Sequence, residues 1–374
     1  MKKLTFLSMV TAFGLMGSTA LADSYQASTW LPQSATTVKV TYSDFAEAVK
    51  KGTGGEVSFD LHVGGALLPA AETLQGVSDG VAAVGDILSA YTPADLPLNN
   101  VVGDLGFLTD SSLVASFAAA EVKFTNQKLR EEWLEHNVVF GGNWSTSEYH
   151  FRCGEEIRSL ADVKGKRVRA SVGAQIDFLK SIEAIPVSVP GSEIYTALER
   201  GSLDCTLVAD ESLQALKLGE VIKFSTEMPM GVFIDGATWG FNRDFWTEIG
   251  AKNRRVILDE MAKYIVLTQV GMLADDETAT KDTQARGVKW LTPESDLALE
   301  LEKFRSSYLQ TLAKAEVEKR KIEDPSDIID DYIKARDKWT KLLANVDKSD
   351  SDALIKLVRS EIYSKVDEKS YGVK

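Results

Sequence analysis

Arg169 is the residue of this chain whose type and position most clearly could do chemistry. It stands at the end of a short β-rich stretch, GKRVRA. A guanidinium in a sheltered site can hold a carboxylate by two parallel charge-assisted hydrogen bonds, each contributing roughly 1.5–3 kcal/mol. The alternative is an arginine paired with a neighbouring Asp or Glu. Arg169 is therefore a candidate anchor for an organic anion.

Alternating strand and helix patterns surround Arg169. GKRVRA is followed by a helix pattern over 173–182, a short strand PVSV, a helix over 191–200 and a strand LDCTLVA. In parallel α/β sheets, ligands bind at the carboxyl ends of strands, where Arg169, Val208 and Asp210 fall. The pattern predicts an α/β lobe with a site at this edge.

The first half of the chain has the same β-α-β-α-β order, with strands in YQASTW, EVSFDLHV and GVAAVGDI and helices over 33–51 and 70–78. A helix over 111–135 then leads to NVVFGGNW and YHFRC, which we interpret as one long strand crossing a hinge near Trp144 to Tyr149. A return crossing is expected over 230–242, followed by a helix over 244–270 that packs on the first lobe. From Ser295 onward the pattern is helical and charged.

The order of residues over 162–204 resembles the substrate-binding proteins of tripartite ATP-independent periplasmic (TRAP) transporters. That pattern is a D-x-K-G-x-x-x-R strand followed by P-x-x-x-P/x-S-E-x-Y-x-A-L-x-x-G-x-x-D. The matching positions are Asp162, Lys164, Gly165, Arg169, Pro186, Ser192, Glu193, Tyr195, Ala197, Leu198, Gly201 and Asp204. The likeness continues through GALLPAAETLQGVSDG, LPLNNV and GATWGFNRDFW.

The resemblance implies an α/β, two-lobed periplasmic binding protein (type II-like) with hinge-crossing strands and a C-terminal helical segment. It also implies that Arg169 grips the carboxylate of an organic acid, which is then delivered to a TRAP membrane permease. The expected organisation is a signal peptide over 1–22, lobe I over 23–145 and lobe II over 146–235. The part over 236–374 carries the return strand, completes lobe I and adds C-terminal helices spanning both lobes.

The first residues have the pattern of a secretory signal. Lys2 and Lys3 precede an apolar run from Leu4 to about Met16, and Ala20-Leu21-Ala22 forms an A-x-A cleavage site. We therefore predict cleavage after Ala22 and export to the periplasm.

The chain is acidic, with 42 Lys and Arg against 55 Asp and Glu and a formal net charge of −13. Such a surface repels nucleic acid and anionic lipid, so neither is expected as a partner. The C-terminal helices are expected to brace both lobes or to form a homodimer contact.

Cys153 and Cys205 are the two cysteines of the sequence. In the kind of lobe that the resemblance implies, their strands lie side by side and antiparallel, which would bring the thiols together. A disulfide is the prediction, and two buried free thiols are the alternative.

Further candidate ligand contacts are Trp30, Glu72, Trp144, Tyr149, Val208, Asp210 and Trp239. Each also has a structural account: core packing for the tryptophans, the helix dipole for Glu72 and a helix cap for Asp210. Asn242 is expected in a turn. Some relatives have a second arginine near Tyr149, but the next arginine here is Arg152, so a two-arginine dicarboxylate clamp is not expected.

Two hypotheses concern the character of the ligand. Relatives often place an amide near Val208, so the aliphatic residue here indicates a less polar pocket. If Trp30, Trp144 and Trp239 converge, their faces would also suit a quaternary ammonium or sulfonium zwitterion through cation–π contacts, with Arg169 on its carboxylate.

Catalytic and cofactor motifs are missing from the sequence. His62, His136 and His150 have no metal-ligand spacing, and there is no G-x-S-x-G elbow, G-x-G-x-x-G turn or phosphate loop. No metal or cofactor is expected, and the interpretation is a non-catalytic receptor. The alternatives are a receptor that serves a membrane sensor kinase and an exported hydrolase.

Overall fold

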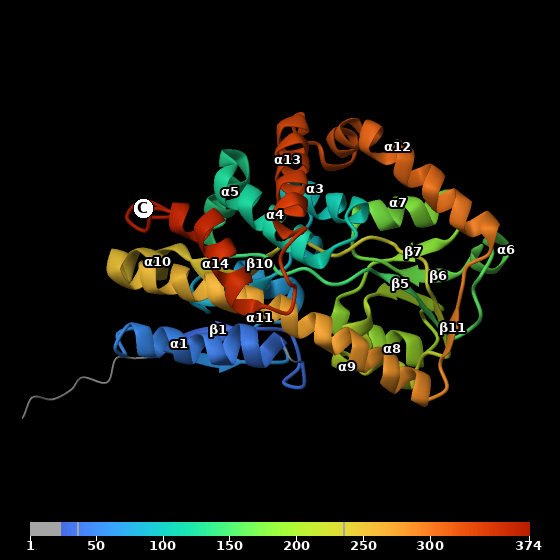
Figure 1. The fold of residues 1–374 in the computed structure, drawn as a ribbon, viewed down its shortest axis with the longest axis horizontal. Coiled ribbons are helices and arrows are strands. Elements are labelled where there is room, and N and C mark those ends of the chain that lie inside the picture. The colour runs from blue at the N-terminus through green and yellow to red at the C-terminus, as the bar shows by residue number, and fades with distance from the viewer. Residues whose placement is uncertain (1–23, 36, 235) are drawn as a thin grey trace, which may run out of the picture.

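The computed structural model describes residues 24–35, 37–234 and 236–374, so the predicted signal peptide lies outside the described residues. These residues form two α/β lobes that lie side by side, each built on one sheet (Figure 1). The predicted fold class is confirmed, because both lobes follow the alternating order of strands and helices expected from the sequence.

The first lobe is built on five strands. Their order in the sheet is β2 (Phe59–His62), β1 (Tyr25–Ser28), β3 (Val84–Ile87), β10 (Ala237–Asn242) and β4 (Val138–Phe140). β1 runs parallel to β2 and β3, whereas β10 runs antiparallel to β3 and β4. β3 and β10 are buried along their whole length, as expected for central strands covered on both faces. The helices of this lobe are α1 (Phe45–Gly52), α2 (Thr73–Ser78), α3 (Pro97–Leu105), α4 (Ser112–Thr125), α5 (Gln127–Glu135) and α10 (Arg243–Glu248).

The second lobe is built on six strands, in the order β11 (Lys289–Leu291), β9 (Phe224–Thr226), β5 (His150–Cys153), β8 (Cys205–Val208), β6 (Arg167–Arg169) and β7 (Ile185–Val187). β6 runs parallel to β7 and β8, and β5 runs antiparallel to β8 and β9. The helices are α6 (Leu160–Val163), α7 (Gly173–Ser181), α8 (Ile194–Glu199) and α9 (Asp210–Ala215). The edge strand β11 was not predicted.

The remaining helices are α11 (Gly250–Ala285), α12 (Ser295–Arg320), α13 (Ser326–Leu343) and α14 (Ser351–Glu361). Short 3-10 or π-helical turns are η1 (Val38–Asp44), η2 (Ala70–Glu72), η3 (Ser89–Tyr91), η4 (Gly106–Leu108), η5 (Gly191–Glu193), η6 (Leu218–Glu220) and η7 (Tyr363–Lys365). None of the helices in the described part of the chain has both the length and the apolar character needed to cross a bilayer. α11 runs along both lobes, and α12 leads from the β11 side of the second lobe back toward α13 (Figure 1).

The predicted long crossing strand is wrong. β4 ends at Phe140, β5 begins at His150, and the segment 141–149 between them does not form a continuous strand. Side chains hold part of its backbone: the Ser145 N–H donates to Gln269 Oε1 at 2.8 Å, and the Trp144 N–H donates to Thr238 Oγ1 at 2.8 Å. The return crossing is likewise only partly a strand, because β10 begins at Ala237. The lobes are therefore joined by largely irregular segments, whose backbone groups bond partly to side chains and partly to each other, as at Tyr149 N–H to the Gly231 carbonyl at 2.8 Å.

Two predicted helices are broken where the sequence has a local capping signal. The helix over 111–135 is interrupted at Asn126, whose side chain accepts from the Leu129 N–H at 3.3 Å and caps α5. The helix over 244–270 is interrupted before Gly250, which has a φ of 74° that favours glycine. After this break α11 continues to Ala285, past the predicted end, and packs on α9 of the second lobe.

A buried charge cluster connects the lobes to α12. Asp104 of α3 in the first lobe accepts from the Ala174 N–H at the start of α7 in the second lobe, at 2.9 Å. The same carboxylate accepts from Arg320 Nη2 at 2.8 Å, and Arg320 also pairs with Glu316. Both acidic side chains are 1% exposed. Arg320 therefore compensates two carboxylates that have little contact with water.

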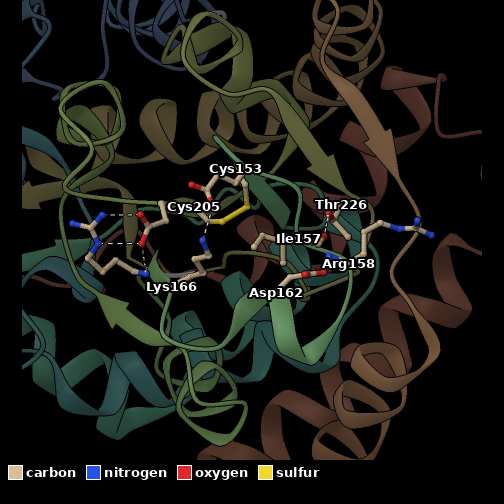
Figure 2. Close-up of a disulfide and its surroundings, with 10 residues drawn as sticks. Cys153, Ile157, Arg158, Asp162, Lys166, Cys205 and Thr226 are labelled. Atoms are coloured by element: carbon tan, nitrogen blue, oxygen red, sulfur yellow. Dashed lines mark hydrogen bonds and ion pairs between the residues drawn. A yellow bond between two sulfur atoms is a disulfide. The ribbon is translucent and has the colours of Figure 1, made fainter.

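A disulfide joins Cys153 and Cys205, as the resemblance implied (Figure 2). The two residues face each other in the antiparallel pair of β5 and β8. The bond therefore fastens the strand that enters the second lobe to the centre of that lobe's sheet.

Reduction of this disulfide is expected to lower the free energy of unfolding by about 2–4 kcal/mol, because a cross-link over 52 residues restricts the unfolded chain. Chemical denaturation with and without a reductant measures the difference. The sequence has only these two cysteines, so the reductant acts on no other thiol pair. Equal midpoints in the two conditions would contradict the expectation.

Candidate ligand-binding site

A cavity of about 70 Å³ lies between the lobes at the carboxyl ends of β6 and β8. Residues from both lobes, both crossing segments and α11 line it, and they are Trp30, Leu31, Thr37, Leu88, Tyr91, Trp144, Thr146, Tyr149, Arg169, Ser171, Gly191, Ile194, Val208, Glu211, Ser212, Ala215, Leu216, Phe233 and Met272. Of the predicted site residues, the structure brings together Trp30, Trp144, Tyr149, Arg169 and Val208. The cavity lies at the edge of the sheet that the strand pattern indicated.

Arg169 occupies the last position of β6 and is 3% exposed. Its Nε donates to the Val189 carbonyl at 3.1 Å and its Nη1 to the Leu207 carbonyl at 3.5 Å. Among the described residues, no Asp or Glu carboxylate lies within ion-pair distance of it. A buried charge without a counter-ion is costly, so the guanidinium is available to an anionic ligand.

Aromatic rings form much of the cavity wall. Trp30 meets Tyr91 edge to face with centroids 5.8 Å apart, Trp144 lies 5.7 Å from Phe233, and Tyr149 stacks on Phe233 at 6.4 Å. The Trp30 Nε1–H is buried and has no hydrogen-bond partner among the described residues. These walls suit a compact ligand with an apolar or cationic body.

The two lobes touch directly beside the cavity. The Gly191 N–H of the second lobe donates to the Tyr91 hydroxyl of the first lobe at 2.9 Å. A Cβ at Gly191 would lie 3.2 Å from the Trp30 ring, so the glycine permits this close approach. Because Arg169 is buried in this arrangement, a ligand can reach it only after the lobes separate.

Glu211 is a cavity residue that the sequence analysis missed. It follows Asp210 at the start of α9, and its backbone N–H donates to Asp276 Oδ1 of α11 at 2.9 Å. Burial and the nearby Asp276 carboxylate raise the pKa of Glu211 well above its usual range. The available signal was an acidic residue just after a predicted strand end, which we assigned to Asp210 instead.

Asp210 does not line this cavity. Its carboxylate pairs with Arg152 and accepts from Thr280 Oγ1 at 2.7 Å. Arg152 is fully buried, also pairs with Glu227 at 2.7 Å and lies over the Trp290 ring. Neither Asp210 nor Arg152 is therefore available to the ligand, and the structure shows no second arginine in the cavity lining.

Glu72 and Trp239 also lie outside the cavity. Glu72 is exposed at the end of η2, before α2. The Trp239 side chain points from β10 into the helix layer, where its Nε1 donates to the Thr41 carbonyl at 3.0 Å and its ring lies 4.8 Å from Phe45. Asn242 caps α10, since its Oδ1 accepts from the Asp244 N–H at 3.0 Å. The residue type alone could not show on which face of β10 Trp239 lies.

Asp86 is a fully buried carboxyl of β3. Burial raises its pKa to about 7, and hydrogen bonds from Tyr42, Trp144 and Thr29 offset part of this effect. The folded state therefore holds the proton more tightly than the unfolded state does. The contribution of Asp86 to the free energy of unfolding is complete below about pH 4 and is lost as the pH rises through about 7.

Asp86→Asn, which resembles the protonated acid, is expected to make the free energy of unfolding less dependent on pH between about pH 4 and 8. Denaturant unfolding at a series of pH values measures this. Asp79→Asn alters an exposed carboxylate of the same lobe and serves as the control. If the free energies of unfolding of wild type and Asp86→Asn differ by the same amount at every pH in this range, Asp86 is not the source of the pH dependence.

No group of three metal-ligating side chains occurs in the part of the chain that the structure describes. Two lobes with a cavity between them are the architecture of a two-lobed solute-binding protein. The sequence profile of the bacterial extracellular solute-binding proteins, family 7 (DctP), matches residues 27–315, and the chain belongs to this family. It is accordingly a binding protein and not an enzyme.

Among similar proteins, the C4-dicarboxylate-binding periplasmic protein DctP of Shewanella loihica is 29% identical over 201 residues, which cover 52% of this chain and 58% of that protein. The chain thus spans little more than half the length of the curated relatives it matches.

Two solved structures share the fold. DctP7 of Bordetella pertussis, a receptor that binds pyroglutamic acid, has a TM-score of 0.71 at 20% identity, covering 83% of this chain and 100% of that one. A TRAP periplasmic solute-binding protein of Bordetella bronchiseptica with bound mandelate has a TM-score of 0.73 at 23% identity, covering 86% of this chain and 99% of that one.

Proposed function

We propose that this protein is the periplasmic receptor of a TRAP transporter, which captures a carboxylate-containing organic anion and delivers it to the membrane permease. The observation that carries the proposal is Arg169, a buried guanidinium in an interlobe cavity, without an ion-pair partner among the described residues. Its position fits a ligand carboxylate that supplies the missing counter-charge.

Family membership supports the receptor role, and the names of the relatives support an organic acid as ligand. Trp30 and Tyr91 come from one lobe and Arg169 from the other, so a ligand that contacts all three stabilises the closed arrangement. Closure is then a shift of population toward the state with more ligand contacts.

The location and the partners belong to the same proposal. Residues 1–22 would direct export and be removed by cleavage after Ala22, and the closed receptor would dock on the permease. The homodimer contact through the C-terminal helices remains a prediction, for which the exposed Leu299 and Leu309 of α12 are the candidate apolar contacts. Sedimentation of the purified protein tests it.

A thermal-shift screen of the mature protein tests the ligand class. The panel contains C4-dicarboxylates, 2-oxo acids, aromatic acids, sugar acids and zwitterionic osmolytes. A carboxylate that binds the folded state at 100 times its dissociation constant stabilises it by about 2.7 kcal/mol, which raises the melting temperature measurably. Stabilisation by an uncharged solute, and by no carboxylate, would refute the proposal.

A further inference from the structure

Three buried polar atoms of the cavity lining have no hydrogen-bond donor or acceptor assigned among the described residues: Trp30 Nε1, Ser171 Oγ and Glu211 Oε2. Glu211 is 7% exposed, and its Oε2 is buried and accepts no hydrogen bond from an N–H or O–H donor of another described residue, although its carboxyl shares a proton with the Asp276 carboxyl. Its other oxygen, Oε1, accepts from the Ser212 hydroxyl at 3.3 Å. Because buried polar atoms in folded proteins are nearly always satisfied, a cavity carboxyl that has only a shared proton and one long hydrogen bond has room for a contact that a ligand supplies.

Glu211 and Arg169 lie at the same edge of the second sheet. Arg169 pairs in register with Thr206 of the neighbouring strand β8, and Glu211 follows the end of that strand. The Tyr149 hydroxyl interacts electrostatically with both groups. Burial is the main cause of the raised pKa of Tyr149, the Arg169 charge lowers this pKa, and the Glu211 carboxylate raises it. Arg169 and Glu211 do not form an ion pair in the described structure, so a short ligand can extend between them past Tyr149.

The surroundings of this path favour a positive group beside Glu211. Trp30, Tyr91, Trp144, Tyr149 and Phe233 line the cavity, and the face of an aromatic ring carries a negative electrostatic potential that attracts a cation. The chain as a whole carries a formal charge of −13, which repels a net anion but not a molecule of zero net charge.

We propose that the ligand is a compact zwitterion, with its carboxylate on Arg169 and its ammonium or sulfonium group between the Glu211 carboxylate and the aromatic rings. This inference rests on the proposed function and narrows its ligand class. Arg169 alone accommodates any organic acid, whereas Glu211 selects among acids by the charge at their other end.

The charged groups around Glu211 set the protonation change on binding. Asp276 approaches it from α11, Asp210 precedes it on α9, and Tyr149 of the crossing segment lies close enough for Glu211 to raise its pKa. The two nearby carboxyls of Glu211 and Asp276 disfavour a second negative charge, and a ligand cation favours it. Binding of the cationic group is therefore expected to release a proton.

Pairs of ligands with the same shape and different charge test the proposal. Titration calorimetry of the full mature protein compares trimethylglycine with 3,3-dimethylbutanoate, 3-(dimethylsulfonio)propanoate with 4-methylpentanoate, and proline with cyclopentanecarboxylate. In at least one pair the zwitterion is expected to bind about tenfold or more tightly than its anionic isostere. Repeating that titration in buffers with different ionisation enthalpies measures the proton release.

Glu211→Gln keeps the shape of the side chain and removes its repulsion with Asp276. The variant is expected to lose most of the preference for the zwitterion over its anionic isostere. Glu220→Gln, at an exposed position after α9, is the matched control and should behave as wild type.

The inference is overturned if the anionic member of each pair binds as well as the zwitterion, if no zwitterion binds, or if Glu211→Gln keeps the preference. None of these results affects the proposed function, provided that some carboxylate stabilises the protein in the broader screen. Failure of every carboxylate in that screen removes both.

Discussion

Arg169→Ala is expected to weaken binding of the carboxylate ligand by at least about a hundredfold. The substitution removes two charge-assisted hydrogen bonds of roughly 1.5–3 kcal/mol each from a site that excludes water. Arg169→Lys keeps the charge but not the planar fork, so it is expected to recover only part of the affinity. Calorimetric titration with the acid found in the screen measures both variants.

Arg167 provides the control on the same strand. It lies two residues earlier on β6, pairs with Asp204 at 2.6 Å and does not line the cavity. Arg167→Ala should therefore bind the ligand as wild type does. Without ligand, Arg169→Ala should lower the melting temperature less than the loss of a paired buried arginine would, because the lost hydrogen bonds to the Val189 and Leu207 carbonyls are offset by removal of a buried charge that no described carboxylate pairs. Unchanged affinity in Arg169→Ala would make this arginine structural.

Arg320→Ala is expected to lower the free energy of unfolding by about 3–5 kcal/mol, because it leaves Asp104 and Glu316 buried without their closest cation. Lys319 compensates only partly, since its Nζ lies 3.9 Å from Asp104 and 3.8 Å from Glu316. Denaturant unfolding at neutral pH measures the loss.

Lys303→Ala is the control on the same helix. Lys303 pairs with Glu300 at 2.6 Å, but its side chain is 68% exposed, so its removal should cost less than about 1 kcal/mol. The loss in Arg320→Ala should also shrink toward acidic pH. Burial and Asp104 raise the pKa of Glu316 to about 7, so this carboxyl becomes neutral on mild acidification. If Arg320→Ala and Lys303→Ala lower the free energy of unfolding by the same amount, burial does not explain the importance of the Arg320 ion pairs.

The fold could be predicted where local patterns decide the structure. Alternating strand and helix signals placed the strands around Arg169, and the signature of the resembling family placed the disulfide correctly. The crossings could not be predicted in the same way. Ser145 and Trp144 bond to Gln269 and Thr238, which lie far away in the sequence, so no local pattern distinguishes these segments from strands.

Site residues were predicted correctly where their position at the end of a strand was enough to place them in the cavity. Arg169 and Val208 end neighbouring strands, and the structure brings them to one cavity. For Asp210 and Glu211, adjacent acids on one short helix, the sequence could not show which one faces the cavity. Long-range contacts decide this, because Arg152 and Thr280 hold Asp210 away from it.

Helix α11 has a mechanical consequence for ligand exchange. Its 36 residues extend roughly 54 Å and pack on α1 in the first lobe and on α9 in the second, so separation of the lobes also has to deform this helix. Gly271 lies within α11 between Gln269, which bonds the crossing segment at Ser145, and Met272, which lines the cavity. Glycine weakens a helix at this point. Opening of the lobes is therefore expected to bend α11, and Gly271 is the position in this central turn where the helix resists bending least.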